Sequence, residues 1–123
     1  MTTVLVIEDN ADNMEIITAL LGNAGYQIFT AMTGMEGLEM AIAKRPDFIL
    51  LDILMPDING DEVLQKLRAT EEGKDVPVIA VTSCAMIGDR ARLLAAGCNG
   101  YIEKPIDPMT IITQIREILG ETQ

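Results

Sequence analysis

Short apolar runs alternate with segments of helical period along the whole of this 123-residue chain. The runs lie at 3–7, 27–31, 47–52, 76–82 and 100–103. Four of them are rich in Val, Ile or Leu without alternation of apolar and polar positions, which is typical of strands covered on both faces. The run 27–31 is more mixed and favours an edge strand. The pattern therefore predicts five strands.

Five segments with apolar residues at helical spacing separate and follow these runs. They are 14–24 before Gly25, a segment capped by Thr33 that runs to 45 before Pro46, 63–67 after Gly60, 85–96 before Gly97, and 111–119 after Asp107 and Pro108 as cap and first turn. Strict alternation of strand and helix implies a parallel sheet between helices with right-handed crossovers. We expect one doubly wound α/β domain, and the alternation alone leaves several strand orders open.

Composition supports a folded domain with an aliphatic core, since 49% of residues are hydrophobic, only 3% are aromatic and there is no Trp. The mean hydropathy is +0.26. No apolar run approaches the roughly 18 residues that cross a bilayer, and the amino terminus lacks a signal pattern. Two cysteines, Cys84 and Cys98, are too few for a disulfide framework and are expected to be small buried hydrophobic residues. We expect a cytoplasmic location.

Charge narrows the classes of partner. Nine basic and 19 acidic residues give a formal charge of −10, which argues against nucleic-acid binding and favours partners with positive surfaces. The chain contains no histidine, so it supplies neither a histidine base nor a histidine ligand nor a phosphohistidine.

Charged residues stand where three of the predicted strands end. Glu8 and Asp9 follow the first run, Asp52 ends the third, and Lys104 follows the fifth. Ligands of open α/β sheets bind outside the carboxyl ends of the strands, where the strand order reverses. For the order 2-1-3-4-5 that position lies between the first and third strands. Three carboxylates and an ammonium would then converge.

Such a convergence predicts a site for a divalent cation and a phosphoryl group. Two carboxylates 4 Å apart repel by about 4 kcal/mol at an effective dielectric near 20, so three of them require a cation. Mg²⁺ suits oxygen ligands and keeps waters that phosphate oxygens can replace. Lys104 and the hydroxyl of Thr82, at the end of the fourth run, are placed to hold phosphate oxygens. Asp52 would be the nucleophile and would form an acyl phosphate.

Over residues 2–121 the chain resembles the receiver domains of response regulators, the CheY-like family of two-component signalling. Five features match in order and spacing: the acidic pair Glu8-Asp9, Asp52 in Leu-Asp-Ile-Leu-Met-Pro with Gly60 eight residues beyond, Thr82 followed by a small residue, Tyr101, and Lys104-Pro105. The resemblance implies a flavodoxin-like sheet of order 2-1-3-4-5. It also implies a receiver without an output domain.

The resemblance also implies roles for single residues. Asp9, Asp52 and the backbone carbonyl of Leu54 would bind Mg²⁺ directly, and Glu8 would act largely through water. Many members have Asp at the position of Glu8, so the longer side chain leaves the metal geometry open. The Lys104–Pro105 bond is expected to be cis.

The family further implies a switch. Thr82 and Lys104 would grip the phosphoryl group, and Tyr101 would turn inward as Thr82 moves. The surface of the fourth helix, fifth strand and fifth helix would then change. The expected partners are a histidine kinase or a histidine phosphotransfer protein and a downstream protein, with the chain a monomer or weak dimer. It would catalyse only its own phosphorylation and dephosphorylation.

Alternatives remain open at this stage. Glu8 and Asp9 would also suit caps of the first helix, although Asp12 alone would serve, and Tyr101 would suit a half-buried core position. A haloacid-dehalogenase phosphatase needs a second Asp where Leu54 stands, and a nucleotide- or flavin-binding domain needs glycines that the loop 8–12 lacks. A degenerate receiver and a piece of a larger regulator or hybrid kinase are further possibilities.

Overall fold

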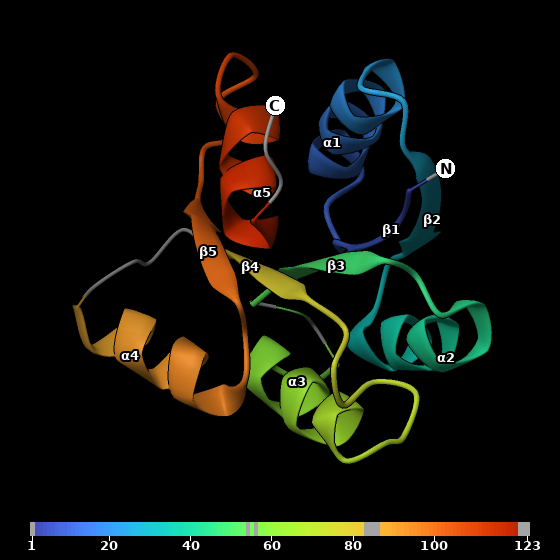
Figure 1. The fold of residues 1–123 in the computed structure, drawn as a ribbon, viewed down its shortest axis with the longest axis vertical. Coiled ribbons are helices and arrows are strands. Elements are labelled where there is room, and N and C mark those ends of the chain that lie inside the picture. The colour runs from blue at the N-terminus through green and yellow to red at the C-terminus, as the bar shows by residue number, and fades with distance from the viewer. Residues whose placement is uncertain (1, 54, 56, 83–86, 121–123) are drawn as a thin grey trace.

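The computed structural model contains a five-stranded parallel sheet in the order β2-β1-β3-β4-β5, with helices on both faces (Figure 1). It describes residues 2–53, 55, 57–82 and 87–120, without the side chains of 87–90. The strands are β1 (Thr3–Ile7), β2 (Gln27–Ala31), β3 (Phe48–Asp52), β4 (Val78–Thr82) and β5 (Gly100–Glu103), and the helices are α1 (Ala11–Asn23), α2 (Gly34–Lys44), α3 (Gly60–Arg68), α4 (Ile87–Ala96) and α5 (Ile111–Leu119). The predicted fold class and strand order are confirmed.

Two strands begin later than the runs of apolar residues predict. β3 begins at Phe48 rather than 47, and β4 begins at Val78 rather than 76. Asp47 still donates its backbone N–H to the carbonyl of Thr3 at 2.9 Å, and its carboxylate accepts from the backbone N–H and the hydroxyl of Thr3 at 2.7 and 3.1 Å. Pro77 has no backbone N–H to give to a neighbouring strand. Its carbonyl accepts from the N–H of Ile49.

The helix caps agree with the prediction at one helix and differ at two. Thr33 caps α2 through a 3.1 Å bond from the N–H of Glu36, as expected. At α1 the cap is Asn10 and not Asp12, because only a residue outside the helix can direct its oxygen at the N–H of Asn13.

The fifth helix begins later than Asp107 and Pro108 suggest. The carboxylate of Asp107 accepts from the N–H of Met109, and its carbonyl accepts from the N–H of Ile111, which closes a separate turn first. Thr110, with φ −122° and ψ −13°, interrupts the helical backbone before α5 starts at Ile111. Asp107 therefore caps this turn and not α5.

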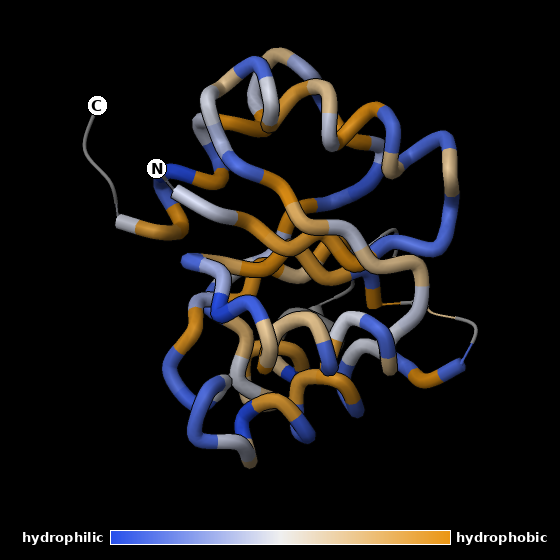
Figure 2. Tube along the Cα trace, turned by 90° about the vertical axis from the view of Figure 1, so that its right-hand side faces the viewer, coloured by the Kyte–Doolittle hydropathy of each residue, from blue (hydrophilic) through white to orange (hydrophobic). Residues whose placement is uncertain are grey.

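The sheet divides the apolar interior into two clusters. One cluster joins Leu5, Ile7, Leu51 and Ala80 to helices α2, α3 and α4, and the other joins their strand neighbours to α1 and α5. Successive side chains of a strand point to opposite faces, so every central strand contributes to both clusters. Figure 2 shows the hydrophobic colour running through the central strands between two helical layers. Cys98 lies buried in the first cluster, and Cys84 lies outside the described residues.

Arg68, the last residue of α3, joins the loop that follows this helix to the loop between α4 and β5. Its Nε and Nη2 donate to the carbonyl of Gly97 at 3.1 and 2.7 Å, and its Nη1 donates to the carbonyls of Gly73 and Val76. Nη2 also donates to the side chain of Asn99. Burial lowers the pKa of the guanidinium, and the donors compensate for that burial by meeting backbone acceptors. The side chain thus fixes the loops that lead into β4 and β5.

Candidate functional site

The carboxyl ends of the strands carry the charged side chains. Glu8 follows β1 and Lys104 follows β5, and the hydrogen bonds of the sheet continue through both. The N–H of Glu8 donates to Ala31 at 3.0 Å, and the N–H of Lys104 donates to Thr82 at 2.8 Å. The sequence places each residue directly after an apolar strand, so its backbone is fixed by the sheet while its side chain leaves the edge. The Lys104–Pro105 bond is cis, as the family resemblance implied.

Three carboxylates lie together at this edge. One oxygen from each of Glu8, Asp9 and Asp52 lies within 4.8 Å of the others. Glu8 is 1% exposed and Asp52 is 4% exposed, whereas Asp9 faces solvent. The Nζ of Lys104 lies 3.3 Å from Glu8 Oε1 and 3.3 Å from Asp52 Oδ2. The structure therefore brings together four of the predicted site residues.

The remaining predicted residues lie on β4, on β5 and beyond β3. Thr82 is buried at the end of β4, one residue past Val81, which pairs with Asp52. Tyr101 pairs with Ala80 and is half-buried against the cluster of α2, α3 and α4, a position that suits a switch residue and a core tyrosine equally. Leu54 lies outside the described residues.

The charges at this site fit a divalent cation. Within the part of the chain that the structure describes, three carboxylates and one ammonium give this cluster a net charge of −2, and two of the carboxylates are withdrawn from water. Buried charges of one sign are unfavourable unless a partner balances them. The donor atoms are all carboxylate oxygens, the ligand type that Mg²⁺ prefers.

Two further polar residues hold the segments around the site in place, and neither stands out in the sequence. Asn13 in α1 donates from Nδ2 to Glu8 Oε1 at 3.1 Å. Asp57, in the loop after β3, accepts from the N–H groups of Gly34 and Met35, each at 2.9 Å. These bonds from Met35 and Gly34 lower the pKa of Asp57. The bonds of Asp57 join segments more than 20 residues apart in sequence, so local patterns carry no signal for this residue. In the sequence, Asn13 looks like one of several cap residues at the start of a helix.

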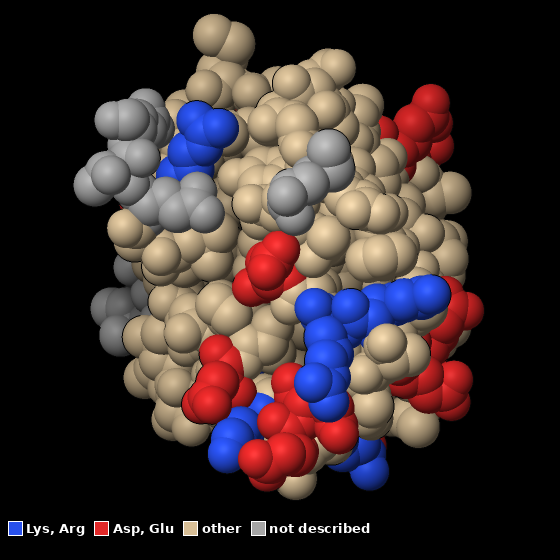
Figure 3. Space-filling view, turned by 45° about the vertical axis from the view of Figure 1, so that its right-hand side comes forward, with Lys and Arg blue, Asp and Glu red and all other residues tan. Residues whose placement is uncertain are grey.

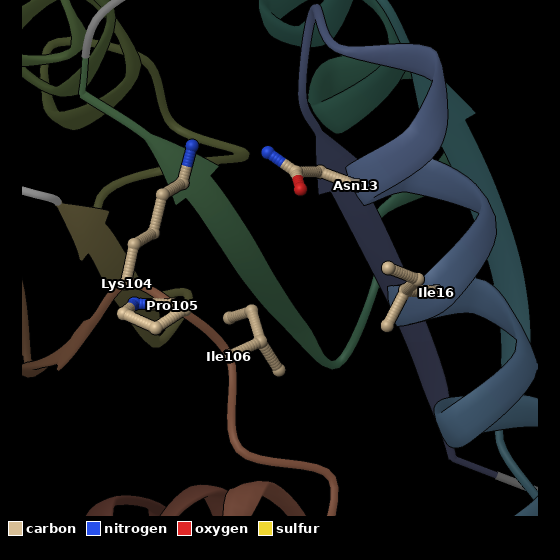
Figure 4. Close-up of a pocket in the computed structure, with 5 residues that line it drawn as sticks. All are labelled: Asn13, Ile16, Lys104, Pro105 and Ile106. Carbon is tan, nitrogen blue, oxygen red and sulfur yellow. The ribbon is translucent and has the colours of Figure 1, made fainter.

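A cavity of about 380 Å³ opens beside the site (Figure 4). Asn13 and Ile16 of α1 line one side, and Lys104, Pro105 and Ile106 line the other. In Figure 4 the amide of Asn13 and the amine of Lys104 point toward one another across the opening. Ile16 is 49% exposed, so an apolar side chain borders the charged cluster. On the face that Figure 3 shows, basic side chains lie close to acidic ones.

Comparison with known proteins agrees with this geometry. The model of the response regulator receiver domain matches residues 4–116. The chain is 40% identical over 119 residues to the polar-differentiation response regulator DivK of Brucella anthropi, and the match covers 97% of each chain. The chemotaxis response regulator CheY4 of Vibrio cholerae superposes with a TM-score of 0.91 at 28% identity, over 96% of this chain and 98% of that one.

A third similar structure bears on the metal. The receiver domain of the sensor histidine kinase PA1611 of Pseudomonas aeruginosa superposes with a TM-score of 0.88 at 33% identity, over 98% of both chains. That structure has a magnesium ion coordinated in its active site cleft.

Fold and site together define a class, the doubly wound domains with an acidic cluster and a lysine at the switch point of the sheet. Within that class, the chain belongs to the receiver domains of response regulators in two-component signalling. The family resemblance read from the sequence is confirmed. No helix in the described ranges has both the length and the apolar character needed to cross a membrane.

Proposed function

We propose that this receiver domain is a phosphorylation switch and that Asp52 accepts the phosphoryl group from a phosphohistidine of a histidine kinase or a histidine phosphotransfer protein. The position of Asp52 carries this proposal. Its carboxylate ends β3, is 4% exposed, and lies between two other carboxylates and an ammonium 3.3 Å away. A carboxylate in that position is a nucleophile with a cation ready to balance the incoming phosphate.

In the proposed reaction an oxygen of Asp52 attacks phosphorus. The P–O bond to the carboxylate forms as the P–N bond to the donor imidazole breaks, and the imidazole leaves with the electron pair of that bond. Lys104 then turns from the carboxylates to a phosphoryl oxygen, and the hydroxyl of Thr82 holds another. Attack of water on phosphorus later releases inorganic phosphate and restores the carboxylate. The chain would thus act only on itself and would turn over no diffusible metabolite.

Mg²⁺ is the cation that the site would hold, through Asp9, Asp52 and the carbonyl of Leu54, with Glu8 acting largely through water. When bound, it would neutralise charge on the phosphoryl oxygens. The net charge of −2 of the described cluster supports this assignment. Glu8 and Lys104 would align the acceptor Asp52. They follow β1 and β5 and Asp52 ends β3, and the sheet fixes the relative positions of these three strands.

The cavity beside Lys104 is where the donor would approach. It opens between α1 and the segment after β5, and its lining combines an ammonium with the apolar side chains of Ile16 and Ile106. A partner chain that delivers a phosphohistidine needs both an apolar contact and an electrostatic one. The excess of acidic residues in the whole chain favours a donor whose surface is basic.

The readout of the switch would lie around Tyr101. Two cavities of about 410 and 420 Å³ border this residue, and together their walls come from α4, β5, α5 and the segment between β5 and α5. Movement of Thr82 toward a phosphoryl group would free space on the Tyr101 side of β4. Turning of Tyr101 into that space would change the shape of both cavities, so a downstream protein would bind one state better.

The test is chemical phosphorylation. Acetyl phosphate with Mg²⁺ should add one phosphoryl group to the chain, measured as intact mass, and Asp52→Asn should stay unmodified. Glu39→Gln is the matched control, since it neutralises an exposed acid of α2 outside the carboxylate cluster and should still be labelled. Labelling of Asp52→Asn would refute the acceptor assignment. A parent chain that takes no phosphoryl group would instead make it a receiver that works by protein contact alone.

A further inference from the structure

Glu8 is the most deeply buried carboxylate of the site and has two donors on the same oxygen. Oε1 accepts from Asn13 Nδ2 at 3.1 Å and lies 3.3 Å from Lys104 Nζ, whereas Oε2 lies 3.5 Å from Lys104. Lys104 is also 3.3 Å from Asp52, so its ammonium is shared between two carboxylates. The amide of Asn13, in contrast, directs its Nδ2 hydrogen bond at Glu8. The two donors therefore differ in how firmly they hold Glu8.

The position of Asn13 follows from the start of α1. Asn10 caps the helix by accepting from the backbone N–H of Asn13 at 3.0 Å, which makes Asn13 the third helical residue. Side chains at this position point back toward the start of the helix and commonly bond to the cap residue itself. Here the amide reaches two residues further back, to the end of β1. A capped helix thus holds the donor in place.

We propose that Asn13 is a positioning residue for the cation site, because its amide keeps the carboxylate of Glu8 in place when Lys104 turns away. This proposal rests on the proposed function, in which Lys104 moves to the phosphoryl group on Asp52. At that point Glu8 would lose its ammonium while still buried, and an unpaired buried carboxylate is costly. Asn13 keeps one of its oxygens bonded throughout.

The chemistry of the amide suits this role better than that of a charged side chain. A positively charged side chain in the place of Asn13 would neutralise Glu8 and weaken its attraction for Mg²⁺. A carboxylate in that place would repel Glu8. A neutral donor satisfies one oxygen and leaves the negative charge of Glu8 available to the cation. The extra methylene of Glu8, compared with Asp, gives the side chain one more rotatable bond. Asn13 removes that freedom.

The experiment is a double-mutant cycle on Mg²⁺ affinity, measured by isothermal titration calorimetry and by Mg²⁺-dependent thermal unfolding. Removal of an outer hydrogen-bond partner of a metal ligand typically weakens metal binding 10–100-fold, and we expect about tenfold for Asn13→Ala. In the Glu8→Asp background the shorter carboxylate no longer meets Asn13, so the same substitution should change affinity by less than about twofold. Asn23→Ala, an exposed asparagine at the other end of α1, is the matched control and should bind Mg²⁺ as the parent does.

The outcomes separate this proposal from the one on which it rests. Affinity of Asn13→Ala within twofold of the parent would overturn the positioning role. An equal loss in the Glu8→Asp background would overturn it too, since the effect would then come through the helix and not through Glu8. A parent that binds Mg²⁺ but accepts no phosphoryl group refutes the proposed acceptor chemistry, and with it the step in which Lys104 turns away from Glu8. A parent that binds no Mg²⁺ refutes both.

Discussion

Neutralising the proposed acceptor should stabilise this protein in the absence of divalent ions. Asp52 is 4% exposed and lies within 4.8 Å of oxygens of Glu8 and Asp9. At an effective dielectric near 20, repulsion at 4.8 Å is about 3.5 kcal/mol per pair, and water screens the pair with exposed Asp9 further. The attraction between the carboxylate of Asp52 and the ammonium of Lys104 at 3.3 Å is favourable by about 5 kcal/mol. The Coulomb contributions therefore nearly cancel.

What remains is the cost of keeping a charged Asp52 out of water, which is several kcal/mol per buried ion. Asp52→Asn keeps the shape of the side chain and removes that cost. We expect the free energy of unfolding to rise by about 2 kcal/mol, which corresponds to roughly 5–10 °C in Tm for a chain of this size. Urea unfolding followed by far-UV circular dichroism measures this directly, and it suits a chain that has no Trp.

Addition of Mg²⁺ should reduce the difference in unfolding free energy between the parent and Asp52→Asn. A ligand at about 100 times its Kd stabilises the folded state by about 2.7 kcal/mol, and the parent should gain this while the variant, which has lost one carboxylate, gains less. Glu39→Gln, in which an exposed acid of α2 is neutralised, controls for the change in net charge and should behave as the parent does. An Asp52→Asn variant that is less stable than the parent without divalent ions, or that gains as much stability from Mg²⁺ as the parent does, would contradict this prediction.

Two further predictions concern side chains whose hydrogen bonds hold loops of the domain in place. The hydrogen bonds from Gly34 and Met35 hold the pKa of Asp57 below its ordinary 3.8, so the stability it adds is present above pH 3.8 and is lost as pH falls through the lowered value. Urea unfolding should show Asp57→Asn less stable than the parent at pH 7 and equal to it in strong acid; a pH-independent difference would contradict this. Arg68→Lys should cost about 2–3 kcal/mol in the same assay, because an ammonium cannot reach the carbonyls on both sides of the guanidinium. A lysine variant as stable as the parent would show that the fork of donors is dispensable.

The sequence predicts the sheet and the charged edge well because both follow from short-range patterns. Apolar runs without alternation mark the strands, and a charged residue directly after such a run must lie at the carboxyl end of the sheet. The order of the strands came from the family resemblance and not from the runs, since alternation permits other parallel orders. The start of β4 shifted because Pro77 has no N–H to give to the sheet, and the start of α5 shifted because Asp107 caps a separate turn first.

The supporting contacts were beyond the reach of sequence patterns for a different reason. Asn13 looks like one of several cap residues at the start of a helix, and its bond to Glu8 exists only because β1 and α1 meet at a particular angle. Asp57 looks like a turn residue, yet it caps a helix that begins 23 residues earlier. Such bonds depend on tertiary placement. The role of Leu54 stays a prediction, because this residue lies outside those that the structure describes.

The division of the interior by the sheet has a consequence for how such a domain can diversify. The helices next to the proposed donor cavity and those that cover the opposite face rest on separate apolar clusters of the described residues, and both clusters include side chains of the central strands. A lineage can therefore exchange residues on α1 to suit a new donor without forcing compensating exchanges under α2 and α3. The carboxylates at the ends of the strands would be retained during such changes, while the two helical faces would acquire new partners independently of one another.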